Sequence, residues 1–319
     1  MNNIDIFNGD ADGICALIQL RSVHPLKSEL ITGVKRDTAL VRRAKVSAGD
    51  KLTVLDVSLD KNRGAVDEAL TLGAEIFYVD HHFAGAIPIS PNFRSCINTS
   101  PDVCTSLLVN QHLSGQRAIW AVVGAFGDNL KSEAVTLAQS LELSASDASR
   151  LEALGIYLNY NSYGSSLEDL HFDPRELFQG TVRYESPLDF LAECPDIFQR
   201  LETGYRDDML QTRDLSPHTE TPRIAVFQLP NEAWARRVSG VLGNDLANKT
   251  PGRAHAVITE ADDGNFLVSV RAPLNNKAGA DEVCRQFPTG GGRKAAAGIN
   301  SLPASMVPEF VATFAKFYA

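Results

Sequence analysis

The sequence predicts an α/β protein, with a doubly wound, mainly parallel sheet in its N-terminal part and a smaller α/β domain towards its C-terminus. In the first half, short apolar runs at residues 3–7, 52–55 and 75–79 each stop at a polar turn that contains an aspartate. Helix-capable segments accompany these runs at residues 13–22, 62–72 and 105–113. Strands that alternate with helices are typical of a parallel sheet with helices on both faces.

The second half divides into a helical region and a further α/β segment. Residues 132–211 have a mostly helical, polar pattern, and residues 215–222 are rich in turn formers, as in a linker. Strand-like runs follow at 223–229, 254–259 and 266–271, with a helix near 234–248 and a last helix near 304–318. We therefore predict a first domain at 1–190, a helical connector and linker at 191–222, and a second domain at 223–319.

Composition excludes several classes of protein. The chain has 319 residues, which favours two domains over one. Its start lacks the basic and apolar regions of a secretory signal, and no apolar run reaches the roughly 18 residues of a membrane span. The five cysteines are scattered without CxxC pairing, which indicates reduced thiols and no structural zinc site. We expect a soluble cytoplasmic protein that does not bind membranes.

The net charge of −9 is unevenly distributed along the chain. Residues 223–319 hold 11 basic and 8 acidic side chains, whereas residues 1–222 hold 19 basic and 31 acidic ones. An acidic first part suits bound cations and a mildly basic second part suits phosphates, although a solvated acidic surface would produce the same counts.

Aspartates stand where the first two apolar runs end. Asp10 and Asp12 lie two residues apart, so on a strand both carboxylates would face one spot, where a cation would relieve their repulsion. Asp56 follows the next run and suits a position between two metal ions. Each acid also has a structural alternative, as a turn residue for the first pair and as a helix N-cap for Asp56.

Asp80, His81 and His82 follow the third run and are all able to bind metals. Imidazole favours manganese, iron or zinc over magnesium, and Asp80 or a neighbour would hold the tautomer of a ligating histidine. Asp128 ends another apolar run, AIWAVVGAFGD, and is interpreted as a fourth acid at a strand end, with a helix cap as the alternative. Four such sites together predict a metal centre at the carboxyl edge of the sheet.

The C-terminal part contains a candidate phosphate site. Gly290, Gly291 and Gly292 leave backbone N–H groups bare, and Arg293 adds charge. We expect this loop to open a helix of small residues, where anions are favoured. Arg271, at the end of the run FLVSVR, is a second candidate contact.

Five motifs in order, NGDADG, LDVS, VDHH, GAFGD and GGGRKAAAG, resemble those of the DHH phosphoesterase family. The match is to the branch with a DHH-associated C-terminal domain, which includes RecJ-type exonucleases and nanoRNases. The resemblance implies two divalent ions, with manganese as the metal. Its ligand sets are Asp10 with Asp56 for one ion, and Asp12, Asp56, His81 and Asp128 for the other.

Three residues depart from the family pattern. Ile6 stands where many members have a histidine, and Asn8 stands where RecJ-like proteins have an aspartate, which makes Asn8 a further candidate ligand. Arg293 stands where many members have a histidine in the glycine motif. The first metal site is therefore expected to have few ligands.

The resemblance implies a manganese-dependent phosphodiesterase with its active site in the cleft between two domains. Asp56, Asp80 and His82 would act in catalysis, with His82 touching the phosphate. Arg271, the three glycines and Arg293 would hold the terminal nucleotide of short single-stranded RNA or DNA, including linear dinucleotides. The alternatives are a phosphatase or phosphodiesterase acting on adenosine bisphosphate or cyclic dinucleotides, and an inactive nucleotide-binding regulator. The oligomeric state stays open, with a homodimer as one alternative.

Overall fold

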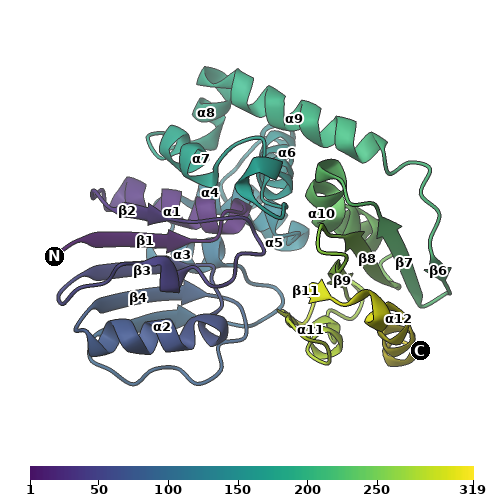
Figure 1. Ribbon diagram of the computed structural model, residues 1–319. Helices are drawn as coiled ribbons and strands as arrows, with labels where there is room; N and C mark the ends of the chain where they lie inside the picture. Colours follow the sequence, from purple (N-terminus) through teal and green to yellow (C-terminus); the bar gives the residue numbers. More distant parts are fainter. The chain divides into compact units, whose positions relative to one another are not determined.

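A five-stranded parallel sheet organises residues 1–202, the first of two units in the computed structural model, which describes residues 1–319 (Figure 1). The strand order is β2-β1-β3-β4-β5, and every neighbouring pair is parallel. The strands are β1 (Asn3–Phe7), β2 (Glu29–Ile31), β3 (Lys51–Leu55), β4 (Glu75–Asp80) and β5 (Phe93–Ile97). The predicted parallel sheet is confirmed, as are its three predicted strands. The sequence analysis missed β2, which has three residues, and β5, which lacks a continuous apolar run.

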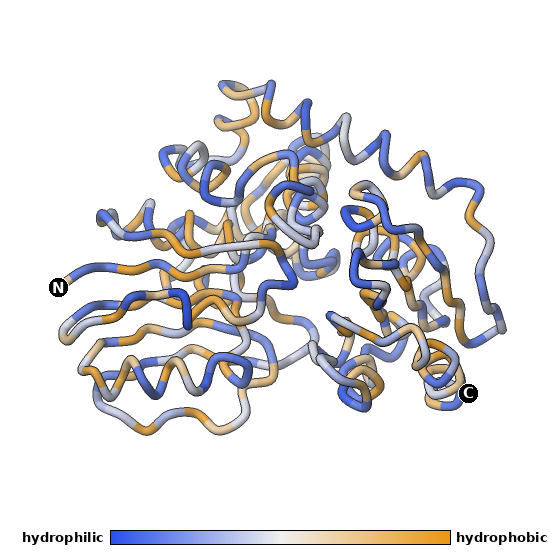
Figure 2. The backbone as a smooth tube through the Cα atoms, viewed as in Figure 1, coloured by the Kyte–Doolittle hydropathy of each residue, from blue (hydrophilic) through white to orange (hydrophobic).

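Helices cover both faces of this sheet. Ile6 of β1 and Val54 of β3 belong to a core that includes α2 (Leu59–Thr71). Alternate residues, such as Phe7, belong to a second core with α1 (Ala11–Val23) and α3 (Thr105–His112). Successive side chains of a strand point to opposite faces, so the consecutive apolar residues that end β1 and β3, such as Ile6 with Phe7 and Val54 with Leu55, pack on both sides of the sheet. Figure 2 colours every residue by its hydropathy.

Helices make up the rest of the first unit and continue into the second. They are α4 (Ala118–Gly127), α5 (Lys131–Ser140), α6 (Ala145–Asn161), α7 (Pro174–Thr181), α8 (Pro187–Glu193) and α9 (Pro195–Leu210). The helical region predicted at 132–211 is confirmed. Three short 3-10 helices lie at Val41–Arg43, Leu167–Asp169 and Ala304–Met306.

The apolar run before Asp128 forms the helix α4, so its interpretation as a strand was wrong. Nearly every residue of α4 is buried, because the helix packs against α1, α3, α5 and α6. A helix that is apolar on all sides has no helical period to detect, and a short apolar run alone does not separate a buried strand from a buried helix.

A six-stranded mixed sheet organises the second unit, Thr203–Ala319. Its order is β10-β11-β9-β8-β7-β6; β7 and β8 are parallel, and the other pairs are antiparallel. The strands are β6 (Thr219–Glu220), β7 (Ile224–Leu229), β8 (Ala254–Glu260), β9 (Phe266–Arg271), β10 (Gly290–Gly292) and β11 (Ala296–Leu302), and the helices are α10 (Ala233–Lys249), α11 (Ala280–Cys284) and α12 (Val307–Phe317). The three predicted strands and the two predicted helices of this part are confirmed.

The glycine-rich segment forms the antiparallel hairpin β10–β11, so the predicted small-residue helix was wrong. Ala297 and Ile299 are buried while Gly298 between them is partly exposed, which is the two-residue period of a strand. Gly290 has a packing reason to be glycine, because a Cβ there would lie 1.8 Å from the carbonyl oxygen of Cys284.

The two units meet in sequence between Glu202 and Thr203, inside the predicted connector 191–222. The expected linker contains β6, which pairs with β7. The predicted domain limits stay predictions. No helix of this chain combines the length and the apolar character that crossing a membrane requires.

Candidate metal centre

Asp10 and Asp12 belong to the start of α1 and not to a strand, which corrects the first prediction about them. Asp10 is the N-cap of α1, and its Oδ1 accepts a hydrogen bond of 3.0 Å from the Gly13 amide. Asp12 lies in the first turn of the same helix. In a helix, neighbours two apart point in different directions, so the two carboxylates have different surroundings.

The start of α3 binds the Asp12 carboxylate. The amide of Thr105 donates to Asp12 Oδ2 and the amide of Ser106 to Asp12 Oδ1, each over 2.7 Å. These are amides that the first turn of a helix leaves without backbone acceptors. They favour a negative charge, and each carboxylate oxygen keeps a lone pair for a cation.

Asp56 follows β3 in a left-handed backbone conformation, with φ of +59°. Such a conformation is uncommon for a residue with a side chain, and strain of this kind concentrates at functional sites. Its Oδ1 lies 3.1 Å from Thr105 Oγ1 and 3.2 Å from His81 Nε2. Burial, and then the charges of Asp10 and Asp12, raise the pKa of Asp56 well above its usual value. A bound cation would relieve that cost.

The His81 ring has its tautomer set by a backbone carbonyl. His81 Nδ1 lies 2.7 Å from the Val103 oxygen, which is only an acceptor, so Nδ1 carries a proton. In the neutral ring, the Nε2 lone pair then faces Asp56 Oδ1 at 3.2 Å and Asp12 Oδ2 at 3.6 Å. Three electron-pair donors that face one another indicate the position of a cation.

Asp80 orients His82, whereas the Val103 carbonyl orients His81. Asp80 Oδ1 lies 2.7 Å from His82 Nδ1, and Asp80 itself is fully buried at the end of β4. The side chain of His82 is 24% exposed. A buried carboxylate therefore orients an imidazole that solvent, or a substrate, can reach.

Asp128 caps the C-terminal end of α4 and is not at a strand end, which corrects that prediction. Its side chain is 4% exposed, and its Oδ2 lies 3.9 Å from His81 Nδ1. Because α4 packs directly on α1, the end of α4 brings Asp128 near the first turn of α1.

Two groups of three side chains converge closely enough to hold a metal ion. Asp12, His81 and Asp128 form one group, and Asp56, His81 and His82 form the other, with their ligand atoms within 4.8 Å of one another. Mixed carboxylate and imidazole ligands suit manganese, iron or zinc. The buried acceptors around His81 thus fit a divalent ion. The individual ligand roles stay predictions.

Lys35 is the site residue that the sequence analysis missed. Its Nζ pairs with Asp10 Oδ2 and lies 3.1 Å from Asn159 Oδ1. Burial opposes the charged form of each group, yet Asp10 raises the pKa of Lys35 and Lys35 lowers the pKa of Asp10. Asp10 belongs to neither converging group. No local signal marks Lys35, because the contact depends on β2 lying beside β1 in the sheet.

Two of the departures from the family pattern have structural roles. Ile6 is fully buried in the core on the α2 side of the sheet. Asn8 Oδ1 accepts a 3.3 Å hydrogen bond from the Asp10 amide, and its Nδ2 donates to the Lys35 carbonyl over 3.3 Å. Asn8 also lies outside both converging groups.

The candidate phosphate contacts lie in the second unit. The Arg271 guanidinium donates from Nε to Asn244 Oδ1 over 2.6 Å and from Nη2 to the Gly240 carbonyl over 3.1 Å, both on α10. Gly290–Gly292 form β10, and Arg293 follows in the turn of the hairpin, where its amide donates to the Ala296 carbonyl. Substrate binding by these residues, and an active site between two domains, stay predictions.

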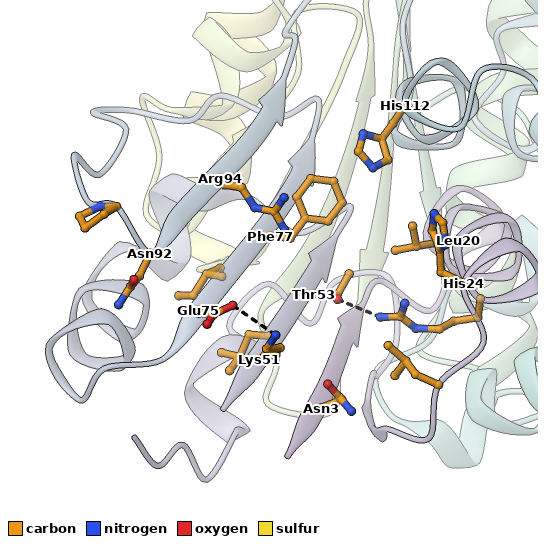
Figure 3. A pocket seen from close by; sticks show the side chains of 15 residues that line it. Asn3, Leu20, His24, Lys51, Thr53, Glu75, Phe77, Asn92, Arg94 and His112 are labelled. Carbon is orange, nitrogen blue, oxygen red and sulfur yellow. Dashed lines mark hydrogen bonds and ion pairs between the residues drawn. The ribbon is translucent and has the colours of Figure 1, made fainter. Parts of the chain in front are cut away.

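A separate cavity of about 520 Å³ opens at the amino ends of the strands of the first sheet, opposite the candidate metal centre (Figure 3). It reaches Asn3, Lys51 and Glu75, the first residues of three parallel strands, whereas Asp56 and Asp80 lie at the carboxyl ends. The Lys51–Glu75 ion pair of 3.5 Å lies on its wall. None of the predicted site residues lines this cavity.

No protein-family model matches the sequence, and no curated protein does either. The structure is similar to that of a DHH domain described as a member of a family of ribosomal proteins, with a TM-score of 0.69 and 11% identity, over 99% of this chain and 86% of the other. It is also similar to RecJ from Thermus thermophilus, solved in complex with Mn²⁺, with a TM-score of 0.60, 18% identity and 99% of this chain covered. This chain spans about half of that RecJ chain (52%).

A third similar structure is the pGpG-specific phosphodiesterase PggH from Vibrio cholerae. It has a TM-score of 0.54 and 15% identity, and the match covers 100% of both chains. Together these similarities show that the chain has the fold of DHH-domain proteins. The resemblance seen in the five motifs is therefore confirmed at the level of the fold.

Proposed function

We propose that this chain is a manganese-dependent phosphodiesterase that hydrolyses short single-stranded oligonucleotides from an end, including linear dinucleotides. The observation that carries the proposal is the convergence on His81. Its Nε2 faces Asp56 at 3.2 Å and Asp12 at 3.6 Å, all three groups being buried where the chain has the fold of metal-binding DHH proteins. When bound, a divalent ion would stabilise the phosphoryl oxygens as a Lewis acid and lower the pKa of the attacking water.

The side chains of this centre would have different roles, some in binding metal and one in contacting the substrate. Two amides of α3 donate to Asp12 and hold its carboxylate in place as a ligand. His82 is the partly exposed group, and Asp80 orients its ring through Nδ1, which leaves Nε2 to contact a substrate phosphate. Asp56 belongs to one converging group, because its Oδ1 lies 3.2 Å from His81 Nε2 and 3.9 Å from His82 Nδ1, and His81 is the residue that both groups share.

The second unit would supply the contacts that select nucleotide substrates. Arg293 follows the glycines of β10 and would bind a substrate phosphate as a charged donor. A similar structure of matching length is named a pGpG-specific phosphodiesterase, which favours a linear dinucleotide among the substrates of this chain.

A time course with end-labelled RNA and DNA, from dinucleotides to longer single strands, tests the proposal with and without Mn²⁺. We expect mononucleotide release only with metal, and a His81→Asn variant should be inactive. Release of phosphate from adenosine bisphosphate, or opening of a cyclic dinucleotide, with no cleavage of linear strands would assign the site to one of the alternative substrates. No turnover of any of them with Mn²⁺ would refute the proposal.

A further inference from the structure

The carboxylate of Asp10 has both oxygens engaged by groups of the protein itself. Oδ1 accepts from the Gly13 amide over 3.0 Å, and Oδ2 pairs with Lys35 Nζ. The side chains of Asp10, Asp12, Asp56 and Asp128 are all 4% exposed or less, and Lys35 forms its ion pair with Asp10. Asp10 differs from the aspartates that converge on His81.

Lys35 is held in place by its backbone. Its amide donates to the Ser162 carbonyl over 2.9 Å, and its carbonyl accepts from Asn8 Nδ2 over 3.3 Å. Two residues before Lys35, the carbonyl oxygen of Gly33 lies so close to Gly9 that a Cβ added to Gly9 would be 2.0 Å from it. These contacts join the segment to the loop after β1 and to the end of α6, so the lysine has a fixed starting point.

The surroundings of the ammonium suit a permanent positive charge. Asn159 Oδ1, from the last turn of α6, lies 3.1 Å from Nζ, and the C-terminal end of a helix favours cations. The Tyr163 ring centroid lies 5.5 Å from Nζ. The side chain is 21% exposed, so the charge is largely enclosed among groups that stabilise it.

We propose that the Lys35 ammonium takes the position of a second divalent ion, so that this centre binds one metal ion, among Asp12, Asp56, His81 and Asp128. Lys35 then serves as a built-in positive charge beside Asp10, at the edge of the same acidic cluster. The inference rests on the proposed function for the metal site, and it departs from the two ions that the sequence resemblance implied. An ion at Asp10 would have to displace an amine that the fold holds in place.

The number of ions per chain tests the inference directly. Equilibrium dialysis of the full chain against Mn²⁺, followed by metal analysis, should give one ion per chain. Electron paramagnetic resonance should show an isolated Mn²⁺ and no exchange-coupled pair. Two ions per chain would overturn the inference and leave the phosphodiesterase proposal intact, whereas the absence of any bound ion would refute both.

Variants assign the effect to Lys35. Lys35→Ala should bind a second Mn²⁺, since Asp10 loses its cation, while Lys27→Ala, an exposed lysine before β2, should keep one. If Lys35→Ala leaves a buried charge that prevents folding, the double variant of Lys35→Met with Asp10→Asn removes both charges and should fold and bind one ion. A folded Lys35→Ala that still binds one ion would show that Lys35 does not exclude the second, and would overturn the inference.

Discussion

Replacement of Asp56 by asparagine isolates the charge that this side chain brings to the metal centre. The amide oxygen of asparagine can still accept from Thr105 Oγ1, which lies 3.1 Å from Asp56 Oδ1, so the local hydrogen bond is kept. The carboxylate 3.2 Å from His81 Nε2 is lost. We expect Mn²⁺ to bind the variant at least about 100-fold more weakly. Loss of a group that only supports a metal ligand weakens metal binding by up to about 100-fold, and loss of a ligand itself should cost no less.

This loss converts into a measurable change in melting temperature. At a Mn²⁺ concentration about 100 times Kd, binding stabilises the wild type by about 2.7 kcal/mol. For a unit of this size, roughly 2–4 °C per kcal/mol gives a rise of roughly 5–10 °C. At the same concentration the variant would gain about 0.4 kcal/mol, or roughly 1 °C.

Without metal, Asp56→Asn should stabilise the protein. The folded pKa of Asp56 lies above the ordinary value of 3.8, because of burial and the charges of Asp10 and Asp12. Its contribution to stability is therefore present below that value and is lost as the pH rises through the folded pKa. Without metal, Asp56→Asn should melt higher than wild type, and the gain should be larger at pH 8 than at pH 5.

Thermal unfolding with and without Mn²⁺ measures both effects, with Asp67→Asn as the control. Asp67 is an exposed carboxylate of α2, paired with Arg63, and its loss should leave the metal-induced shift unchanged. If Asp56→Asn keeps the wild-type shift, Asp56 is not a ligand. A metal-free variant that melts lower at pH 8 would contradict the electrostatic reasoning.

Three further outcomes are expected. Wild type should turn over faster with Mn²⁺ than with Mg²⁺ at saturating concentrations, because an imidazole ligand favours manganese, and equal rates would argue against His81 as a ligand. Arg293→Ala should raise KM for oligonucleotides by roughly 10- to 150-fold, because a charged contact is worth about 1.5–3 kcal/mol. Hydrolysis of bis-p-nitrophenyl phosphate, which lacks the distal nucleotide, should be unchanged. An equal loss of activity on both substrates would mean that Arg293 acts in the chemical step. Burial, followed by Arg253, lowers the pKa of His255 to about 4, so stability present above pH 6.5 is lost as the pH falls towards 4. His255→Leu should therefore reduce the drop in melting temperature between pH 7 and pH 5, and an unchanged drop would mean that His255 is not its cause.

The apolar runs of the sequence predicted strands correctly where the local pattern is typical of a strand and of no other element. The runs that became β1, β3 and β4 are short, end at polar turns and alternate with helices. The run before Asp128 shows the limit, because a helix buried on all sides has the same composition as a buried strand. The glycines of β10 show a second limit, since bare amides suit an anion loop and a tightly packed hairpin equally well.

The amino-acid sequence by itself determined the parallel sheet, the order of the motifs and the acids and histidines from which a metal centre can be built. Only the tertiary structure decided which of those groups face one another. His81 meets Asp12 and Asp56 because the start of α1 and the carboxyl ends of β3 and β4 converge, and Asp10 meets Lys35 because β2 pairs with β1. Such contacts join residues far apart in the chain, and their distances depend on how strands and helices pack, which no local spacing of residues specifies.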